Sequence, residues 1–219
     1  MPYRYSPTER TLQTRRQAPL VIGEPQIGIV LDRSGSMQSI RTEVIEGFNR
    51  LLAQQKEIRQ AASLALVLFN DRVTLLYDAV PIADVPALSA ESYLPEGGTA
   101  LNDAIGLMAQ ALGKRASRLT PTLIIAITDG NENSSREFSE AHVRQIVRYR
   151  QVNHDWEFLF LGPQSGHHYA RMLGIPEDHI IGFDADSTGI TQIMDRLGTT
   201  LEAYRLGDRN YALRLKERE

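Results

Sequence analysis

Residues 27–37 read IGIVLDRSGSM, an apolar run that ends in polar residues. Its first five residues are too few and too uniformly apolar for an amphipathic helix, so they predict a strand buried on both faces. The strand gives way to Asp32, Ser34 and Ser36, which place side-chain oxygens at alternate positions. Taken alone, these three residues fit either a polar turn at a strand end or one part of a metal site.

Outward from this stretch, apolar runs alternate with helical patterns. Apolar residues recur three and four positions apart from Ile40 onward, which indicates a helix capped by Ser39. Ser134 and Glu137 have the spacing of a capping box, which predicts the start of a later helix. The predicted strands are 27–31, 63–69, 73–80, 122–130, 157–162 and 179–183, and the predicted helices begin near residues 40, 101, 134, 169 and 187.

Strands that alternate with helices favour an α/β protein with a mostly parallel sheet and helices on both of its faces. An Asn-Asp turn at residues 70–71 joins the strands 63–69 and 73–80, which predicts an antiparallel pair at one edge. We therefore expect a doubly wound, Rossmann-like sheet with one antiparallel edge strand. In such sheets ligands bind beyond the carboxyl ends of the strands, so the loops that follow the strands are the places to search.

Those loops carry a set of oxygen ligands. Thr99 in the GGTAL loop and Asp129 after the strand at 122–130 join Asp32, Ser34 and Ser36. Two carboxylates and three hydroxyls, without histidine or sulfur, suit hard cations: Mg²⁺ before Ca²⁺ or Mn²⁺. We call these five residues the oxygen cluster and predict that they form a metal site.

The segments IVLDRSGSM, GGTAL and IAITDG resemble the metal-ion-dependent adhesion site (MIDAS) of von Willebrand factor A-type (vWA) domains. That pattern is D-x-S-x-S, then a distant threonine, then a distant aspartate, and all five positions are present in order. The segment GGTALNDAI is similar to the corresponding segment of small bacterial, intracellular members of the family. The resemblance extends from residue 27 to about residue 204 and implies the doubly wound vWA fold.

The resemblance also implies a role for each member of the oxygen cluster. Ser34 and Ser36 would bind Mg²⁺ directly, while Asp32 would act mainly through water and orient the loop. Thr99 would bind directly or through water, and Asp129 would lie behind the direct ligands or hold a coordinated water. One coordination position would stay open for an Asp or Glu of a protein partner, so the implied function is Mg²⁺-dependent protein binding without catalysis.

Length and composition limit the domain organisation and the cellular location that we expect. The 219 residues suit one domain, which we place at 20–206, with a poorly ordered basic tail at 1–19 and a tail or edge extension at 207–219. The net charge of −3 argues against a molecule built to coat nucleic acid. The sequence has no cysteines, which fits a cytoplasmic protein and excludes disulfides. No apolar run is long enough to span a bilayer or to act as a secretory signal, so we expect no membrane association. Composition leaves the oligomeric state open.

Three alternatives stay open at this level. A Mg²⁺-dependent phosphatase or hydrolase would use the same carboxylates, although the sequence has no P-loop and no histidine or lysine beside the motif. Nucleic-acid binding through the arginines of the tail 1–19 is the second. The third is a metal-free site of the same fold. At the rim, Arg33 would select an acidic partner or remain solvated, and Glu132 and Asn133 would line the site or remain solvated loop residues.

Overall fold

A six-stranded sheet in the order β3-β2-β1-β4-β5-β6 forms the centre of the described part of the chain. The structure is a computed structural model that describes residues 23–117, 119–208, 210–212 and 215. All neighbouring strands pair in parallel except β2 and β3, which are antiparallel, as the Asn-Asp turn predicts. The strands are β1 (Gln26–Asp32), β2 (Ser63–Phe69), β3 (Val73–Pro81), β4 (Thr122–Ile127), β5 (Glu157–Gly162) and β6 (Ile180–Gly182).

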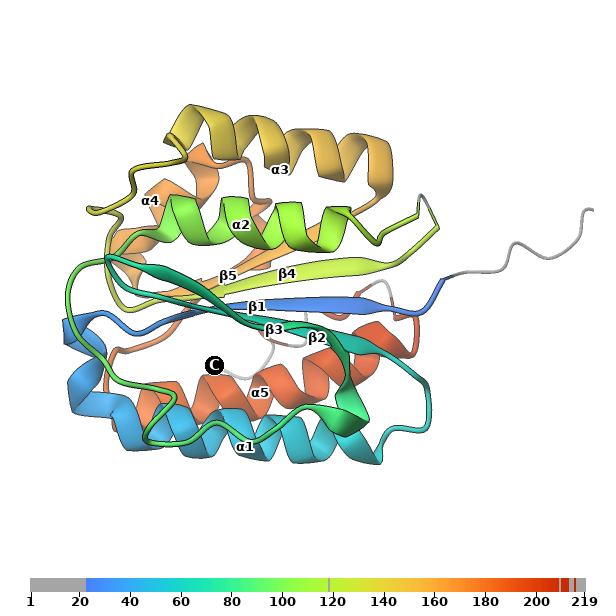
Figure 1. The fold of residues 1–219 in the computed structure, drawn as a ribbon, viewed down its shortest axis with the longest axis horizontal. Helices are drawn as coiled ribbons and strands as arrows, with labels where there is room; N and C mark the ends of the chain where they lie inside the picture. The colour runs from blue at the N-terminus through green and yellow to red at the C-terminus, as the bar shows by residue number, and fades with distance from the viewer. Residues whose placement is uncertain (1–22, 118, 209, 213–214, 216–219) are drawn as a thin grey trace, which may run out of the picture.

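Helices cover both faces of this sheet, so the predicted doubly wound α/β fold is confirmed (Figure 1). On one face lie α1 (Arg41–Glu57) and α5 (Ser187–Arg205), which pack side by side. The opposite face carries α2 (Leu101–Gly113), α3 (Glu140–His154) and α4 (Gln164–Met172). The described residues also form the short 3₁₀ helices η1 (Gly35–Ile40), η2 (Ile82–Asp84) and η3 (Glu177–His179).

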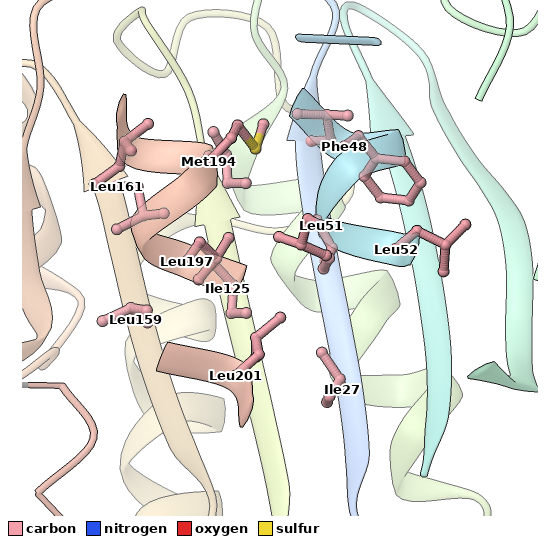
Figure 2. Packing of buried hydrophobic residues seen from close by; sticks show 14 of the residues in the cluster. Ile27, Phe48, Leu51, Leu52, Ile125, Leu159, Leu161, Met194, Leu197 and Leu201 are labelled. Atoms are coloured by element: carbon pink, nitrogen blue, oxygen red, sulfur yellow. The ribbon is translucent and has the colours of Figure 1, made fainter. Parts of the chain in front are cut away.

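Two hydrophobic cores form because successive residues of a strand point to opposite faces. Toward α1 and α5, strand residues such as Ile27 and Ile125 meet Leu51 and Leu197, as Figure 2 shows. On the other face α2 lies so close to β1 that a Cβ added at Gly28 would approach within 2.7 Å of the Met108 sulfur. Every residue of β1 is buried, which fits the central strand of a parallel sheet.

Two predicted helix caps are wrong, although α1 begins at Arg41, close to the predicted residue 40. Ser39 does not cap α1: Ile40 holds the N-cap position, because the motif loop first winds into η1, and the Ser39 hydroxyl bonds to the carbonyl of Ser36. The capping box at 134–137 opens no helix; α3 begins at Glu140, with Ser139 as its cap. The carboxylates of Glu132 and Asp103 accept the backbone N–H groups of residues 134–138, so these groups have partners outside a helix and the segment forms no helix.

Parts of the predicted terminal segments can be placed. The predicted tail at 1–19 lies outside the described residues. In the segment 207–219, Tyr211 and Leu215 are fully buried, and the Tyr211 ring packs edge-on against Tyr204 of α5 with centroids 5.0 Å apart. None of the helices in the described ranges is long and apolar enough to cross a membrane.

Candidate metal centre at the carboxyl end of the sheet

The loop after β1 turns its side chains toward one another. Asp32 is the last residue of the strand, and its Oδ1 accepts a hydrogen bond of 2.6 Å from the backbone N–H of Ser34. This Asp-to-backbone contact two residues on is the usual way in which aspartate starts a turn. The hydroxyls of Ser34 and Ser36 then lie 3.1 Å apart. The alternate spacing of the motif therefore brings its oxygens to one point.

The base of the site is formed by Asp32, which is completely buried. Its second carboxylate oxygen, Oδ2, accepts a hydrogen bond of 2.5 Å from the hydroxyl of Thr128, the residue that follows β4. The Tyr93 hydroxyl donates a 2.6 Å hydrogen bond to the backbone carbonyl of Asp32. Sequence reasoning missed both partners. Thr128 was visible inside the TDG motif, whereas nothing in the sequence marks Tyr93.

Asp129 approaches the same point from the end of β4. Its Oδ1 accepts a hydrogen bond of 2.7 Å from the hydroxyl of Ser36, 93 residues earlier in the chain. The contact exists because β1 and β4 are adjacent parallel strands, so their carboxyl ends meet at one edge of the sheet. Ser36 is exposed and Asp129 is partly exposed, which places both at the mouth of the site.

Thr99 completes the oxygen cluster from the GGTAL loop. A Cβ built on Gly130 would lie 3.3 Å from the Thr99 hydroxyl oxygen and 4.0 Å from that of Ser36, so the two hydroxyls border the same small space. Thr99 is held by a reciprocal pair of bonds with Asn133: its N–H donates to the Asn133 side chain, and its carbonyl accepts the Asn133 N–H, at 2.9 and 3.0 Å. The structure thus brings all five predicted residues together.

The two glycines before Thr99 are needed because the GGTAL loop lies very close to the loops that follow β1 and β4. Gly97 has a φ of +71°, a left-handed conformation that side chains with a Cβ adopt at a cost, and its carbonyl accepts the N–H of Gly35 at 3.1 Å. A Cβ on Gly98 would lie only 2.1 Å from the Ser134 hydroxyl. Glycines at these positions let the GGTAL loop contact both neighbouring loops.

Two acidic residues hold the loop beside Asp129. Glu132 accepts hydrogen bonds from the N–H groups of Asn102, Ser134 and Ser135, and from the Ser135 hydroxyl. Asp103 accepts three more from the N–H groups of residues 136–138. Both carboxylates therefore serve as structural hydrogen-bond acceptors, and Glu132 is not merely a solvated loop residue.

Burial shapes the electrostatics of the cluster. It raises the pKa of Asp32 to about 6, even though the hydrogen bonds from Thr128 and Ser34 act in the opposite direction. Partial burial also raises the pKa of Asp129. Two carboxylates whose ionised forms are disfavoured by burial gain from a nearby cation, because an opposite charge favours ionisation.

The donor set fits a hard divalent cation. Mg²⁺ binds oxygen at 2.0–2.1 Å in an octahedron, so neighbouring ligand oxygens lie roughly 3 Å apart. The distances of 3.1 Å between the two serine hydroxyls and 2.7 Å between Ser36 and Asp129 are close to this spacing. The described part of the chain has no group of three or more histidine, aspartate or glutamate side chains placed to hold a metal, so the hydroxyls are essential to the candidate site.

Comparison with known proteins agrees with this fold. The family model for the von Willebrand factor type A domain matches residues 27–132. No curated protein matches the sequence significantly.

Solved structures show the same fold at low identity. A von Willebrand factor type A protein from Catenulispora acidiphila shares 19% identity with a TM-score of 0.58, over 80% of this chain and 42% of that one. Proximal thread matrix protein 1 from the mussel byssus, with a zinc-occupied MIDAS motif, shares 11% with a TM-score of 0.56, over 80% and 47%. The SpRpn10 VWA domain shares 12% with a TM-score of 0.57, over 80% and 95%. This chain thus spans less than half of the first two proteins.

Proposed function

We propose that this chain is a vWA-type interaction domain that binds a divalent cation, Mg²⁺ first, and through it an Asp or Glu of a protein partner. One observation carries the proposal: side chains from three separate loops converge at the carboxyl end of the sheet, with oxygens at the spacing of metal ligands. The family match and the zinc-occupied MIDAS of a structural neighbour support it.

The proposed ligands divide by exposure. Ser34 and Thr99 lie at the buried base, whereas Ser36 and Asp129 reach the mouth. The three hydroxyls would hold the cation, and Asp32 and Asp129 would balance its charge and fix its waters. Because the hydroxyls are neutral, the cation would remain electrophilic enough to accept a carboxylate from outside. The bound ion would supply this coordination chemistry alone.

Calorimetry tests the metal site directly. We expect the native chain to bind Mg²⁺ with one site per chain, and Asp32→Ala to lose that binding. Ser36→Ala and Asp129→Asn alter residues at the mouth, so they test the site without a change at its buried base. Asp195→Ala, which removes an exposed carboxylate paired with Arg50, is the matched control. Equal Mg²⁺ affinity in all five proteins would refute the metal site.

The two other candidate functions have their own tests. Mg²⁺-dependent phosphatase turnover that disappears in Asp32→Ala would replace the binding function with an enzymatic one. Salt-dependent DNA binding that disappears when residues 1–18 are deleted would support a nucleic-acid function.

A further inference from the structure

Arg33, the variable residue inside the D-x-S-x-S motif, has a fixed backbone position beside the proposed metal. Its N–H donates to the carbonyl of Phe69 at the end of β2 at 2.7 Å, and its carbonyl accepts the N–H of Glu96 at 2.9 Å. The side chain runs across the end of β2, because its Nη2 lies 3.3 Å from the hydroxyl of Thr74 in β3. The side chain of Arg33 thus reaches from the end of β1, beside the proposed metal, to the antiparallel edge strand β3.

This guanidinium retains unused hydrogen-bonding capacity. An arginine has five N–H donors, and the contact with Thr74 is a long bond to a neutral acceptor. The Nε of Arg33 is buried without a hydrogen-bond partner, so an outside carboxylate would have to approach the terminal nitrogens of the guanidinium. Within the described residues no carboxylate lies within ion-pairing distance of Arg33, whereas Arg115 pairs with both oxygens of Asp78. Arg33 is therefore a partly exposed cation suited to bind a carboxylate from outside.

We propose that Arg33 binds a second carboxylate of the partner, so that the recognised segment is extended and carries two acidic residues. The first would bind the metal and the second would bind Arg33; the inference therefore rests on the proposed function. Adjacent strands are about 4.8 Å apart, so β1 and β3 are separated by roughly 10 Å across β2. An extended segment advances about 3.3 Å per residue and places alternate side chains on the same face, so two acidic residues two positions apart would both face the protein, about 7 Å apart, and the side chains would span the remaining distance.

Synthetic peptides test this spacing. The probes are Gly-Ser peptides with one Asp, or with two Asp residues separated by one to six positions, titrated in the presence of Mg²⁺ and followed by NMR. We expect a spacing of two to bind about 5-fold or more tightly than the single-Asp peptide, as a charge-assisted pair allows. Other spacings should bind like the single-Asp peptide.

Arg33→Gln should abolish this gain while Mg²⁺ affinity stays within about 2-fold, and Arg33→Lys should restore part of the gain. Arg72→Gln is the matched control, since it removes the same charge from an exposed residue of the β2–β3 turn. Equal losses in Arg33→Gln and Arg72→Gln, or an equal gain at every spacing, would overturn the inference, because general charge attraction would then explain the binding.

The two levels of the hypothesis fail in different ways. If the single-Asp peptide binds only with Mg²⁺ but no spacing adds affinity, the role of Arg33 is wrong and the metal-dependent function stands. If no peptide depends on Mg²⁺, the proposed partner chemistry is wrong and the inference about Arg33 is wrong with it.

Discussion

The hydroxyl of Thr128 donates a 2.5 Å hydrogen bond to Oδ2 of Asp32, so a residue just after β4 holds the carboxylate that ends β1. The bond joins adjacent parallel strands at the point where the oxygen cluster begins. It also reduces the burial-driven rise in the pKa of Asp32. Thr128 therefore positions the carboxylate without belonging to the predicted ligand set.

Thr128→Val should weaken Mg²⁺ binding, because Asp32 loses a donor that favours its ionised and oriented form. The lost hydrogen bond should also lower the free energy of unfolding by about 1–3 kcal/mol. Thr122→Val, at the start of the same strand, removes another buried hydroxyl that bonds to a backbone carbonyl. Calorimetry should find Mg²⁺ affinity reduced in the first variant and unchanged in the second; the same affinity in both would contradict the role of Thr128.

Asp103→Asn should loosen the loop that follows Asp129. The carboxylate accepts three backbone N–H groups, and an amide has one acceptor oxygen in place of two. We expect the free energy of unfolding to fall by about 1–3 kcal/mol, measured by urea denaturation. Hydrogen exchange of the amides at 136–138 should accelerate more than that of the Gly189 amide, which is bonded to Asp186 in the cap of α5. Equal acceleration at both places would argue against a local role.

Gly28→Val should destabilise the fold by overpacking, at a cost of about 1–3 kcal/mol. A Cβ at this position would lie 2.7 Å from the Met108 sulfur and 2.9 Å from the Leu112 Cδ1, so these side chains, or α2 itself, would have to shift. Gly28→Val combined with Met108→Ala should recover part of the loss. An unchanged midpoint in urea for the single variant would show that α2 has more freedom than its packing indicates.

His179 should give the stability of the chain a pH dependence near neutrality. Burial alone lowers the pKa of this imidazole, but the carboxylates of Glu157 and Asp178 outweigh it and raise the pKa above 6.5. The protonated form is therefore favoured in the folded state. Its stabilisation is fully present below pH 6.5 and disappears as the pH rises through the folded-state pKa.

The difference in unfolding free energy between the native chain and His179→Gln, measured from about pH 5 to about pH 9, should shrink as the pH rises. His168→Gln changes an exposed histidine and serves as the control. A difference that is independent of pH would contradict the ion pairs of His179.

Much of the fold follows from the sequence, because buried strands and amphipathic helices have different periods. IGIVL and TLIIAI could be assigned from their composition alone, and the Asn-Asp turn predicted the antiparallel edge pair. The two helix caps could not be assigned in this way. Ser134 and Glu137 satisfy a local rule, but Asp103 competes for the same backbone groups from a helix more than 30 residues earlier.

In the candidate site, too, residues in local motifs could be predicted, whereas a residue brought there only by the fold could not. Its five residues were visible because each follows a strand or glycine pair in a motif. Tyr93 was invisible, since a tyrosine in an irregular loop has no signal until the fold brings its hydroxyl to the carbonyl of Asp32. Metal binding by the five residues stays a prediction.

The contact between Ser36 and Asp129 has a consequence for folding. Ser36 and Asp129 are 93 positions apart in the sequence, and Thr99, whose hydroxyl borders the same space, comes from a third loop. Contacts between residues so far apart require the closure of long loops, which lowers the entropy of the chain. We therefore expect the oxygen cluster to assemble late in folding. Under the proposed function, Mg²⁺ affinity would then report whether a given molecule has completed folding, and a partner that requires the ion would bind mature chains and ignore unfinished ones.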